Sequence, residues 1–235
     1  MPPARNYDRV QQQYSQYVPK PSTVRKIALT LAVICLIIFS FLAYAVATNN
    51  DITLQDVRIV NWIADKANPT LTAFAFLITT IGSPLFITVA VLAGAIGSYL
   101  RFHAAKLAIL FVSVGAGAAL TMTILKLIFH RQRPIMAHPL DHEIGFSFPS
   151  GHATMSASVY GLCIFLIVTH VKRAWLRIVL AIALSVLVFA VALSRIYLGV
   201  HYPVDVAGGI CLGTAWTCVS FVLYSKAIER INHSR

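Results

Sequence analysis

Two histidines and one aspartate stand at spacings that suit acid–base or nucleophilic chemistry. His201 and Asp205 lie four residues apart. The carboxylate can therefore accept a hydrogen bond from one imidazole nitrogen and leave the other nitrogen free to react. His152 follows Ser150 and Gly151 at the predicted start of another helix. Taken alone, Asp205 is explained equally well as a helix cap, and a lone histidine such as His152 is more often structural.

Three basic side chains occupy apolar stretches where cations are rare. Lys126 and Arg133 are seven residues apart, two helical turns, so they share a face if the helix continues to Pro134, which would end it. Arg195 lies at the end of a later apolar run. A lysine at mid-depth in a membrane costs about 2.5–3.5 kcal/mol. Snorkelling to the headgroups accounts for one such cation, but not for three.

Together these groups are complementary to an anion. Converging cations repel each other unless an anion lies between them, and each charge-assisted bond contributes about 1.5–3 kcal/mol. Ser150 is a plausible helix cap, and Gly151 lets an anion approach the free backbone amides. A tetrahedral phosphate has enough oxygens for all of these donors. The residues therefore predict a phosphate site.

The composition predicts a membrane protein. Of 235 residues, 58% are hydrophobic and 11% are charged, about half the charged share of a soluble domain, and the mean hydropathy is +0.75. Apolar runs long enough to span a bilayer recur along the chain. Six spans are expected: Ile27–Ala47, Pro84–Leu100 (with Leu71–Ile81 as an extension before Gly82-Ser83-Pro84), Leu107–Phe129, Ala153–Val171, Leu176–Leu193 and Val204–Tyr224.

Two further patterns complete the expected architecture. Apolar residues at helical spacing between Asp51 and Asn68 predict an amphipathic helix on the membrane surface. Gly209 and Gly213 form a pair of small residues that predicts a close helix contact. The expected fold is thus all-α, a polytopic membrane protein with six transmembrane helices and a surface amphipathic helix near 51–68.

The positions of the basic residues predict the orientation. The net charge of +11 would suggest nucleic acid in a soluble protein, but here it follows the predicted cytoplasmic segments, so no nucleic-acid partner is expected. Residues 1–26 are expected to be a flexible cytoplasmic tail, 27–225 the six-span domain and 226–235 a second cytoplasmic tail. Only six of the 19 lysines and arginines fall elsewhere: Arg58, Lys66, Lys126, Arg131, Arg133 and Arg195.

Three motifs in order carry a family resemblance. They are Lys126-(six residues)-Arg133-Pro134, Pro149-Ser150-Gly151-His152, and Ser194-Arg195-(five residues)-His201-(three residues)-Asp205. This set resembles the motifs of the type 2 phosphatidic acid phosphatase (PAP2) superfamily, and six spans are similar to its membrane branch. Each motif alone is weak, but three in this order are highly specific.

The resemblance implies a chemistry for each motif residue. His201 would be the nucleophile that forms a phosphohistidine, Asp205 would orient it, and His152 would protonate the leaving alkoxide. The phosphate-binding residues implied are Lys126, Arg133, Ser150, Gly151 and Arg195. It implies hydrolysis of a lipid phosphate or pyrophosphate at the outer face of the cell membrane, with no cofactor, no metal and no obligate protein partner. The partners expected are the lipid bilayer and a membrane lipid with a phosphate or pyrophosphate headgroup.

Other functions fit parts of the sequence. The same site could pass phosphate to an acceptor other than water, as in a phosphotransferase. Ser150 could be an acyl-hydrolase nucleophile, but this leaves the cations unexplained. An anion transporter would need polar residues down to the midplane, whereas here they stop at the outer ends. A divalent metal could bind the loop between spans three and four, although the spacing matches no common site: His138, Asp141, His142 and Glu143.

Overall fold

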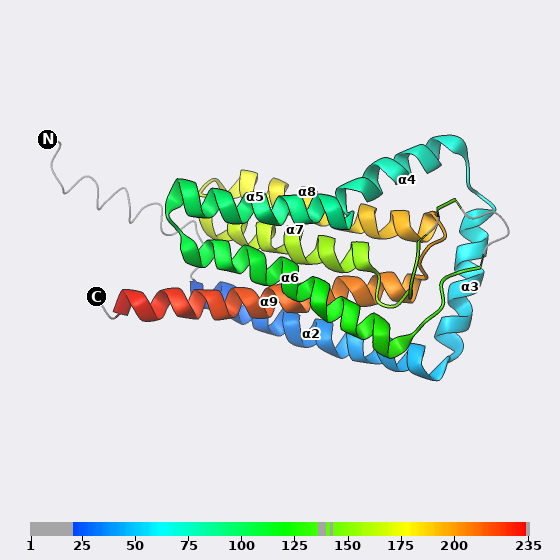
Figure 1. Cartoon of the computed structure of the whole chain (residues 1–235). Helices are drawn as coiled ribbons and strands as arrows, with labels where there is room; N and C mark the ends of the chain where they lie inside the picture. Colours follow the sequence, from blue (N-terminus) through cyan, green and yellow to red (C-terminus); the bar gives the residue numbers. More distant parts are fainter. Residues whose placement is uncertain (1–20, 136–139, 142, 234–235) are drawn as a thin grey trace, which may run out of the picture.

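The computed structural model is all-helical over the residues it describes, 21–135, 140–141 and 143–233 (Figure 1). Long helices lie side by side in a bundle, and two shorter ones, α3 and α4, lie at one end of it. The elements are α2 (Pro21–Thr48), α3 (Asp51–Ala64), α4 (Pro69–Ile81), α5 (Pro84–Phe102), α6 (Ala105–Phe129), α7 (Gly151–His170), α8 (Ala174–Tyr197) and α9 (Pro203–His233).

Within the described part of the chain, six helical segments are long and apolar enough to cross a membrane. The prediction of a six-span, multi-pass membrane protein is therefore confirmed. Several boundaries differ: α2 begins at Pro21, before the expected Ile27, α8 continues past Leu193 to Tyr197, and α9 continues past Tyr224 to His233. The second span combines α4 and α5 across Gly82, which is the extension that the sequence allowed.

The break between α4 and α5 follows the predicted turn chemistry. The Ser83 hydroxyl accepts a hydrogen bond from the Phe86 amide, and Pro84 occupies the first turn of α5. Proline is compatible with that position because its missing N–H would have no helical partner there. The chain can thus end one helix and start the next inside a single span.

Helices α7 and α9 form the most buried pair of spans. Their backbones approach closely, because a Cβ on Gly209 would lie 2.7 Å from the carbonyl oxygen of Ser150, and one on Gly213 would lie 2.3 Å from that of Thr154. The predicted small-residue contact is therefore confirmed. At the end of this contact the Ser150 amide donates to the Asp205 carbonyl at 2.9 Å. The packing holds the second and third motifs together.

Helix α3 crosses the end of the bundle (Figure 1). Asn50 caps it, accepting a hydrogen bond from the Ile52 amide. The predicted helix in 51–68 is thus confirmed, although it ends at Ala64. Its inner face packs against the protein, since Val60 and Asp56 are both 2% exposed and Val60 belongs to a cluster with residues of α8 and α9. The buried charge of Asp56 was not expected in a surface helix.

Candidate active site

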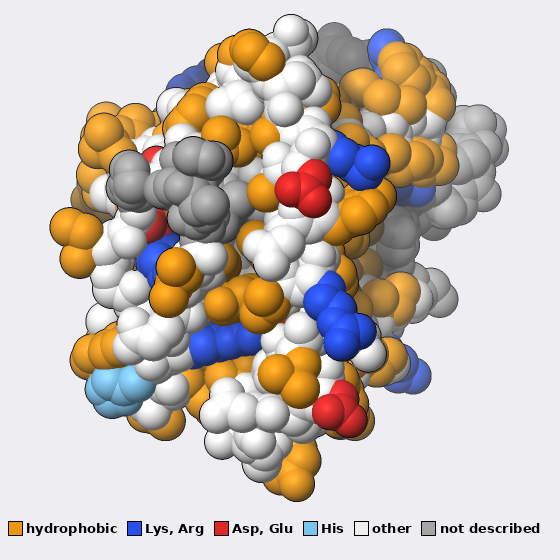
Figure 2. Space-filling model, turned by 90° about the vertical axis from the view of Figure 1, so that its right-hand side faces the viewer, with side chains coloured by type: hydrophobic (Ala, Val, Ile, Leu, Met, Phe, Trp, Pro, Cys, Tyr) orange, Lys and Arg blue, Asp and Glu red, His pale blue; other side chains and the backbone are white. Residues whose placement is uncertain are grey.

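The three motifs meet at the end of the bundle that carries α3. The last turns of α6 and α8 and the first turns of α7 and α9 lie there, joined by the segments after α6 and after α8 (Figure 1). Figure 2 views this end directly and shows some of the Lys and Arg side chains recessed between apolar and uncharged groups. The ends of four helices and the two joining segments thus supply the site.

The first motif reaches the site differently from the prediction. Helix α6 ends at Phe129, and His130 has a left-handed backbone with φ of 46°. Lys126 and Arg133 therefore do not share a helical face, and the expectation that Pro134 ends this helix is wrong. The cause is the turn at His130, which redirects the chain before the proline is reached. Arg133 enters the site from the extended segment that follows.

That extended segment is fixed by contacts with the residues just before α7. The Ser147 amide donates to the Arg131 carbonyl at 2.8 Å, and the Ser147 hydroxyl donates to the Gln132 carbonyl at 3.0 Å. Arg133 adds a bond from its Nε to the Gly145 carbonyl at 2.9 Å. Lys126 donates to the Phe146 carbonyl. The first motif is thus bound to the segment that leads into the second motif.

Arg195 is the most deeply buried cation of the site. It is 1% exposed, and its NH1 donates to the Thr79 hydroxyl at 2.7 Å. Its NH2 pairs with the carboxylates of Glu143 and Asp141. Its Nε is buried and makes no hydrogen bond. The guanidinium thus keeps one donor, Nε, available for a ligand. Helix α4, which sequence analysis did not connect to the site, helps to orient the Arg195 side chain through Thr79.

The second motif presents donors at the start of α7. Ser150 is the N-cap residue by backbone conformation, but its hydroxyl makes no capping bond and is buried without a partner. A Cβ at Gly151 would meet Met122 at 3.3 Å. His152 stands on the first turn with Nδ1 3.4 Å from a Glu143 oxygen. The unused hydroxyl and the free amides of the first turn can receive an anion.

The third motif brings the predicted histidine and carboxylate together. His201 Nδ1 lies 3.5 Å from Asp205 Oδ2, which is ion-pair distance without the predicted hydrogen bond, and both side chains are buried. The same Oδ2 accepts a hydrogen bond from the Tyr202 amide at 2.9 Å. Asp205 therefore combines the capping and the orienting arrangement. The other nitrogen of His201, Nε2, lies 3.2 Å from Arg133 NH1.

One carboxylate lies where the cations and both histidines converge. Glu143 pairs with Arg133 at 2.9 Å and with Arg195, and its oxygens lie 3.4 Å from His152 and 3.6 Å from His201. Burial alone would raise the pKa of Glu143, but its contact with His201 and the charge of Arg195 hold that pKa well below its usual range. Glu143 thus marks a position that a phosphoryl group could occupy.

The structure brings most of the predicted site residues into one place. Arg133, Arg195, His152 and His201 surround the Glu143 carboxylate, and Asp205 lies behind His201. The other three predicted residues lie beside this group, in contact with its loops and helix ends: Lys126, Ser150 and Gly151.

The alternative metal site is not supported by the described part of the loop. Asp141 and Glu143 form ion pairs with Arg195 instead of leaving their oxygens to a cation. His138 and His142 lie outside the described residues. Among the residues that are described, no group of three or more potential ligands is arranged for a metal ion.

Replacing Glu143 with glutamine should change both phosphate affinity and stability. The neutral side chain no longer competes for the two arginines, so we expect inorganic phosphate or vanadate to bind at least about tenfold more tightly, the equivalent of one lost competing charge-assisted bond. Isothermal titration on protein in detergent measures this. Weaker anion binding than in the unmodified protein would contradict it.

The same variant should be less stable without phosphate, in a pH-dependent way. The pKa of Glu143 is depressed on folding, so its ionised form stabilises the folded protein above the unfolded pKa of about 4.3, and this contribution is lost as the pH falls through the depressed value. Thermal unfolding should show a lower Tm for Glu143→Gln at pH 7, and a difference that narrows below about pH 4. A difference independent of pH would contradict this assignment.

Comparison with known proteins identifies relatives of this arrangement. A model of the PAP2 superfamily matches residues 106–229, more than half of the chain. The chain is 43% identical over 109 residues to the bacitracin transport permease protein BcrC of Bacillus licheniformis, covering 41% of this chain and 49% of that protein. It is 43% identical over 94 residues to phosphatidylglycerophosphatase B of Bacillus subtilis, covering 38% of this chain and 44% of that protein. The chain thus matches about half the length of these curated relatives or less.

A solved structure extends the similarity to the whole bundle. The crystal structure of a transmembrane PAP2 type phosphatidylglycerolphosphate phosphatase from Bacillus subtilis aligns with a TM-score of 0.73 at 28% identity. The alignment covers 85% of this chain and 96% of that chain. The fold is therefore shared beyond the segment that contains the three motifs.

Proposed function

The chain belongs to the PAP2 superfamily, and we propose that it hydrolyses a phosphate or diphosphate ester of a membrane lipid. The observation that carries the proposal is the convergence of two arginines and two histidines on one half-buried carboxylate, that of Glu143. Relatives named as phosphatases of phosphatidylglycerophosphate, of a decaprenyl-linked phosphoribose and, putatively, of undecaprenyl diphosphate support a lipid substrate.

The reaction proceeds in two displacements. His201 Nε2 attacks phosphorus, the bond from phosphorus to the lipid oxygen breaks, and His152 gives its proton to that oxygen. A water molecule then attacks the phosphohistidine while His152 takes a proton from it, and inorganic phosphate leaves. Asp205 beside Nδ1 keeps Nε2 unprotonated for attack and stabilises the cation formed on phosphorylation. Two moderate barriers replace one very high barrier.

Fixed cations supply the electrostatic stabilisation. Arg133 and Arg195 pair with the phosphoryl oxygens in place of Glu143, and Lys126 adds a third positive charge. The Ser150 hydroxyl and the Gly151 amide donate to the remaining oxygens, which explains why that hydroxyl is buried without a partner. Preorganised donors of this kind are typically worth about 10²–10³-fold each in kcat. The site therefore needs no divalent ion to neutralise the phosphate.

The site is proposed to face the extracytoplasmic side. The start of α2 and the end of α9 lie at the opposite end of the bundle (Figure 1). Most lysines and arginines outside the site are in the tails and connections that belong to that opposite end. Positive charge favours the cytoplasm, so the termini are cytoplasmic. A lipid in the outer leaflet can then place its phosphate at the site while its tail stays in the bilayer.

A transporter is the second candidate, since one relative is named a transport permease. Transport of an anion requires polar groups through the midplane. In the described residues the buried charged side chains Asp56, Arg195 and Asp205 all lie at the α3 end. Anion flux into proteoliposomes separates the two functions. Flux without phosphate release would favour transport.

A phosphate-release panel tests the proposed reaction. Purified protein in detergent should release inorganic phosphate from at least one of phosphatidylglycerophosphate, undecaprenyl pyrophosphate, phosphatidate and a sphingolipid phosphate. The rate should be unchanged by EDTA, because arginine and lysine take the place of a metal. Repeating the assay with alcohols and sugars as acceptors detects a phosphotransferase. No release from any of the four, or loss of release with EDTA and recovery with Mg²⁺, would contradict the proposal.

A further inference from the structure

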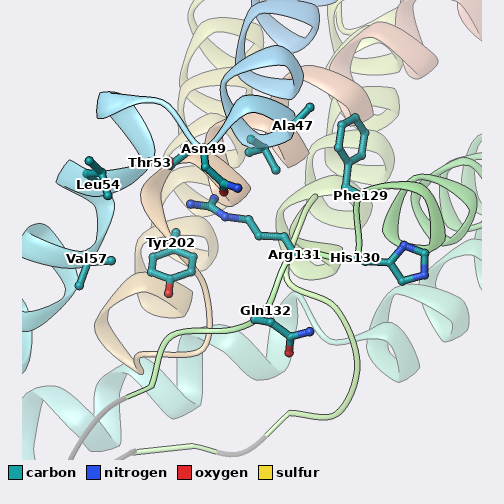
Figure 3. A pocket seen from close by; sticks show the side chains of 11 residues that line it. Ala47, Asn49, Thr53, Leu54, Val57, Phe129, His130, Arg131, Gln132 and Tyr202 are labelled. Carbon is teal, nitrogen blue, oxygen red and sulfur yellow. The ribbon is translucent and has the colours of Figure 1, made fainter.

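Arg131 lies behind the histidine–carboxylate pair, outside the three motifs. Its NH1 donates to Asp205 Oδ1 at 2.6 Å and its NH2 donates to Asp56 Oδ2 at 2.7 Å. The guanidinium also stacks 4.3 Å from the centre of the Tyr202 ring. Figure 3 shows the side chain extended from the end of α6 across a pocket beside α3, with Tyr202 next to it. One arginine thus joins the site to α3.

The contact with Arg131 leaves the two oxygens of Asp205 with different partners. Oδ2 faces His201 Nδ1 and accepts from the Tyr202 amide, while Oδ1 is taken by Arg131. A carboxylate held at both oxygens cannot rotate, so its orientation toward the imidazole is fixed. The guanidinium also supplies an opposite charge to this fully buried carboxylate, because an unpaired charge at such depth is strongly disfavoured.

Asp56 holds the arginine in turn. Its Oδ1 accepts from the Val204 amide at 3.2 Å, at the start of α9, and its Oδ2 accepts from Arg131. Burial raises the pKa of Asp56, and Arg131 opposes that rise. Two carboxylates thus share one guanidinium, and Arg131 is held from both sides.

We propose that Arg131 and Asp56 are positioning residues that hold Asp205 in its productive orientation toward His201. This inference rests on the proposed function. Residues that orient metal ligands in enzymes typically change activity by about 10–100-fold when they are replaced, and we expect an effect of similar size for the residues that orient Asp205. Helix α3 thereby contributes to the reaction without touching the substrate, since it presents Asp56 to the start of α9.

The first test compares Asp56→Asn with Asp51→Asn, an exposed aspartate on the same helix. With any lipid phosphate that the unmodified protein hydrolyses, Asp56→Asn should lower kcat about 10–100-fold and change KM less than about threefold, because substrate contacts are intact. Asp51→Asn should match the unmodified protein. Equal kcat in both variants would overturn the inference while leaving the proposed function in place, whereas an inactive unmodified protein would overturn the proposed function itself.

The second test restores the missing charge. The pocket beside Arg131 has a volume of about 540 Å³ and reaches the surface between α2, α3 and α6, so guanidinium can enter Arg131→Ala. Guanidinium chloride at millimolar concentration should raise kcat of that variant at least about tenfold, and neutral urea of similar shape should not. Rescue by urea as well as by guanidinium would mean a packing role and overturn the inference. If Arg131→Ala does not fold, the comparison of Asp56→Asn with Asp51→Asn decides.

Discussion

His201→Ala is expected to abolish turnover while the protein still binds phosphate. The substitution removes the atom that attacks phosphorus but leaves Arg133, Arg195 and the start of α7 in place. Loss of a nucleophile that acts with its partners costs about 10⁶-fold in a well-studied protease, so kcat should fall at least about 10⁴-fold. Phosphate release measures kcat, and titration with vanadate measures anion binding.

Matched variants separate the chemical role of His201 from its packing. His170 lies at the other end of the bundle and is exposed, so His170→Ala should keep full activity. His201→Gln preserves most of the volume and should be as inactive as the alanine variant. Unfolding of each variant in detergent shows whether the fold is intact. Turnover within tenfold of the unmodified protein in His201→Gln would remove the nucleophile assignment.

His152→Ala is expected to affect substrates according to their leaving groups. A lipid alkoxide needs a proton as it leaves, so kcat for lipid phosphates should fall by about 10²–10⁴-fold. A nitrophenyl phosphate has a leaving group that is stable without a proton. With nitrophenyl phosphate, the first turnover of His152→Ala should therefore stay fast and give a burst of about one nitrophenolate per site. A slow steady state should follow, because no group activates the water that hydrolyses the phosphohistidine.

Stopped-flow absorbance measures the burst in His152→Ala. Its amplitude should follow the enzyme concentration, and Asp205 and His201 should still be required for it. Equal losses for lipid and nitrophenyl substrates in the first turnover would contradict the role of His152 as the acid. Wild-type kinetics with both would exclude His152 from the reaction.

The six spans and the order of the motifs could be predicted because they depend on local properties. Apolar runs of about twenty residues specify spanning helices whatever their neighbours, and Gly209 and Gly213 indicated where α7 and α9 approach. The four-residue spacing of His201 and Asp205 placed them together at the start of α9, with His201 just before its first residue. These features need only the period of the α-helix and the thickness of the bilayer.

Features that depend on long-range pairing could not be predicted. The end of α6 at Phe129 is set by contacts of the next segment with Ser147, which lies 16 residues after Arg131. Asp56 and Thr79 join the site only because α3 and α4 fold over its end. Glu143 was named only as a possible metal ligand in its loop, because its pairing with Arg133 and Arg195 depends on how the helices pack. One signal did exist, since Arg131 was among the basic residues outside the cytoplasmic segments.

The most direct test of the account is to trap the covalent intermediate. His152→Ala mixed with ³²P-labelled nitrophenyl phosphate and quenched in alkali within the burst should carry about one label per protein, stable to base and labile to acid. Peptide mapping should place the label on His201, and His201→Gln should carry none. Label on Ser150, or a full burst of nitrophenolate with no labelled protein, would contradict the account.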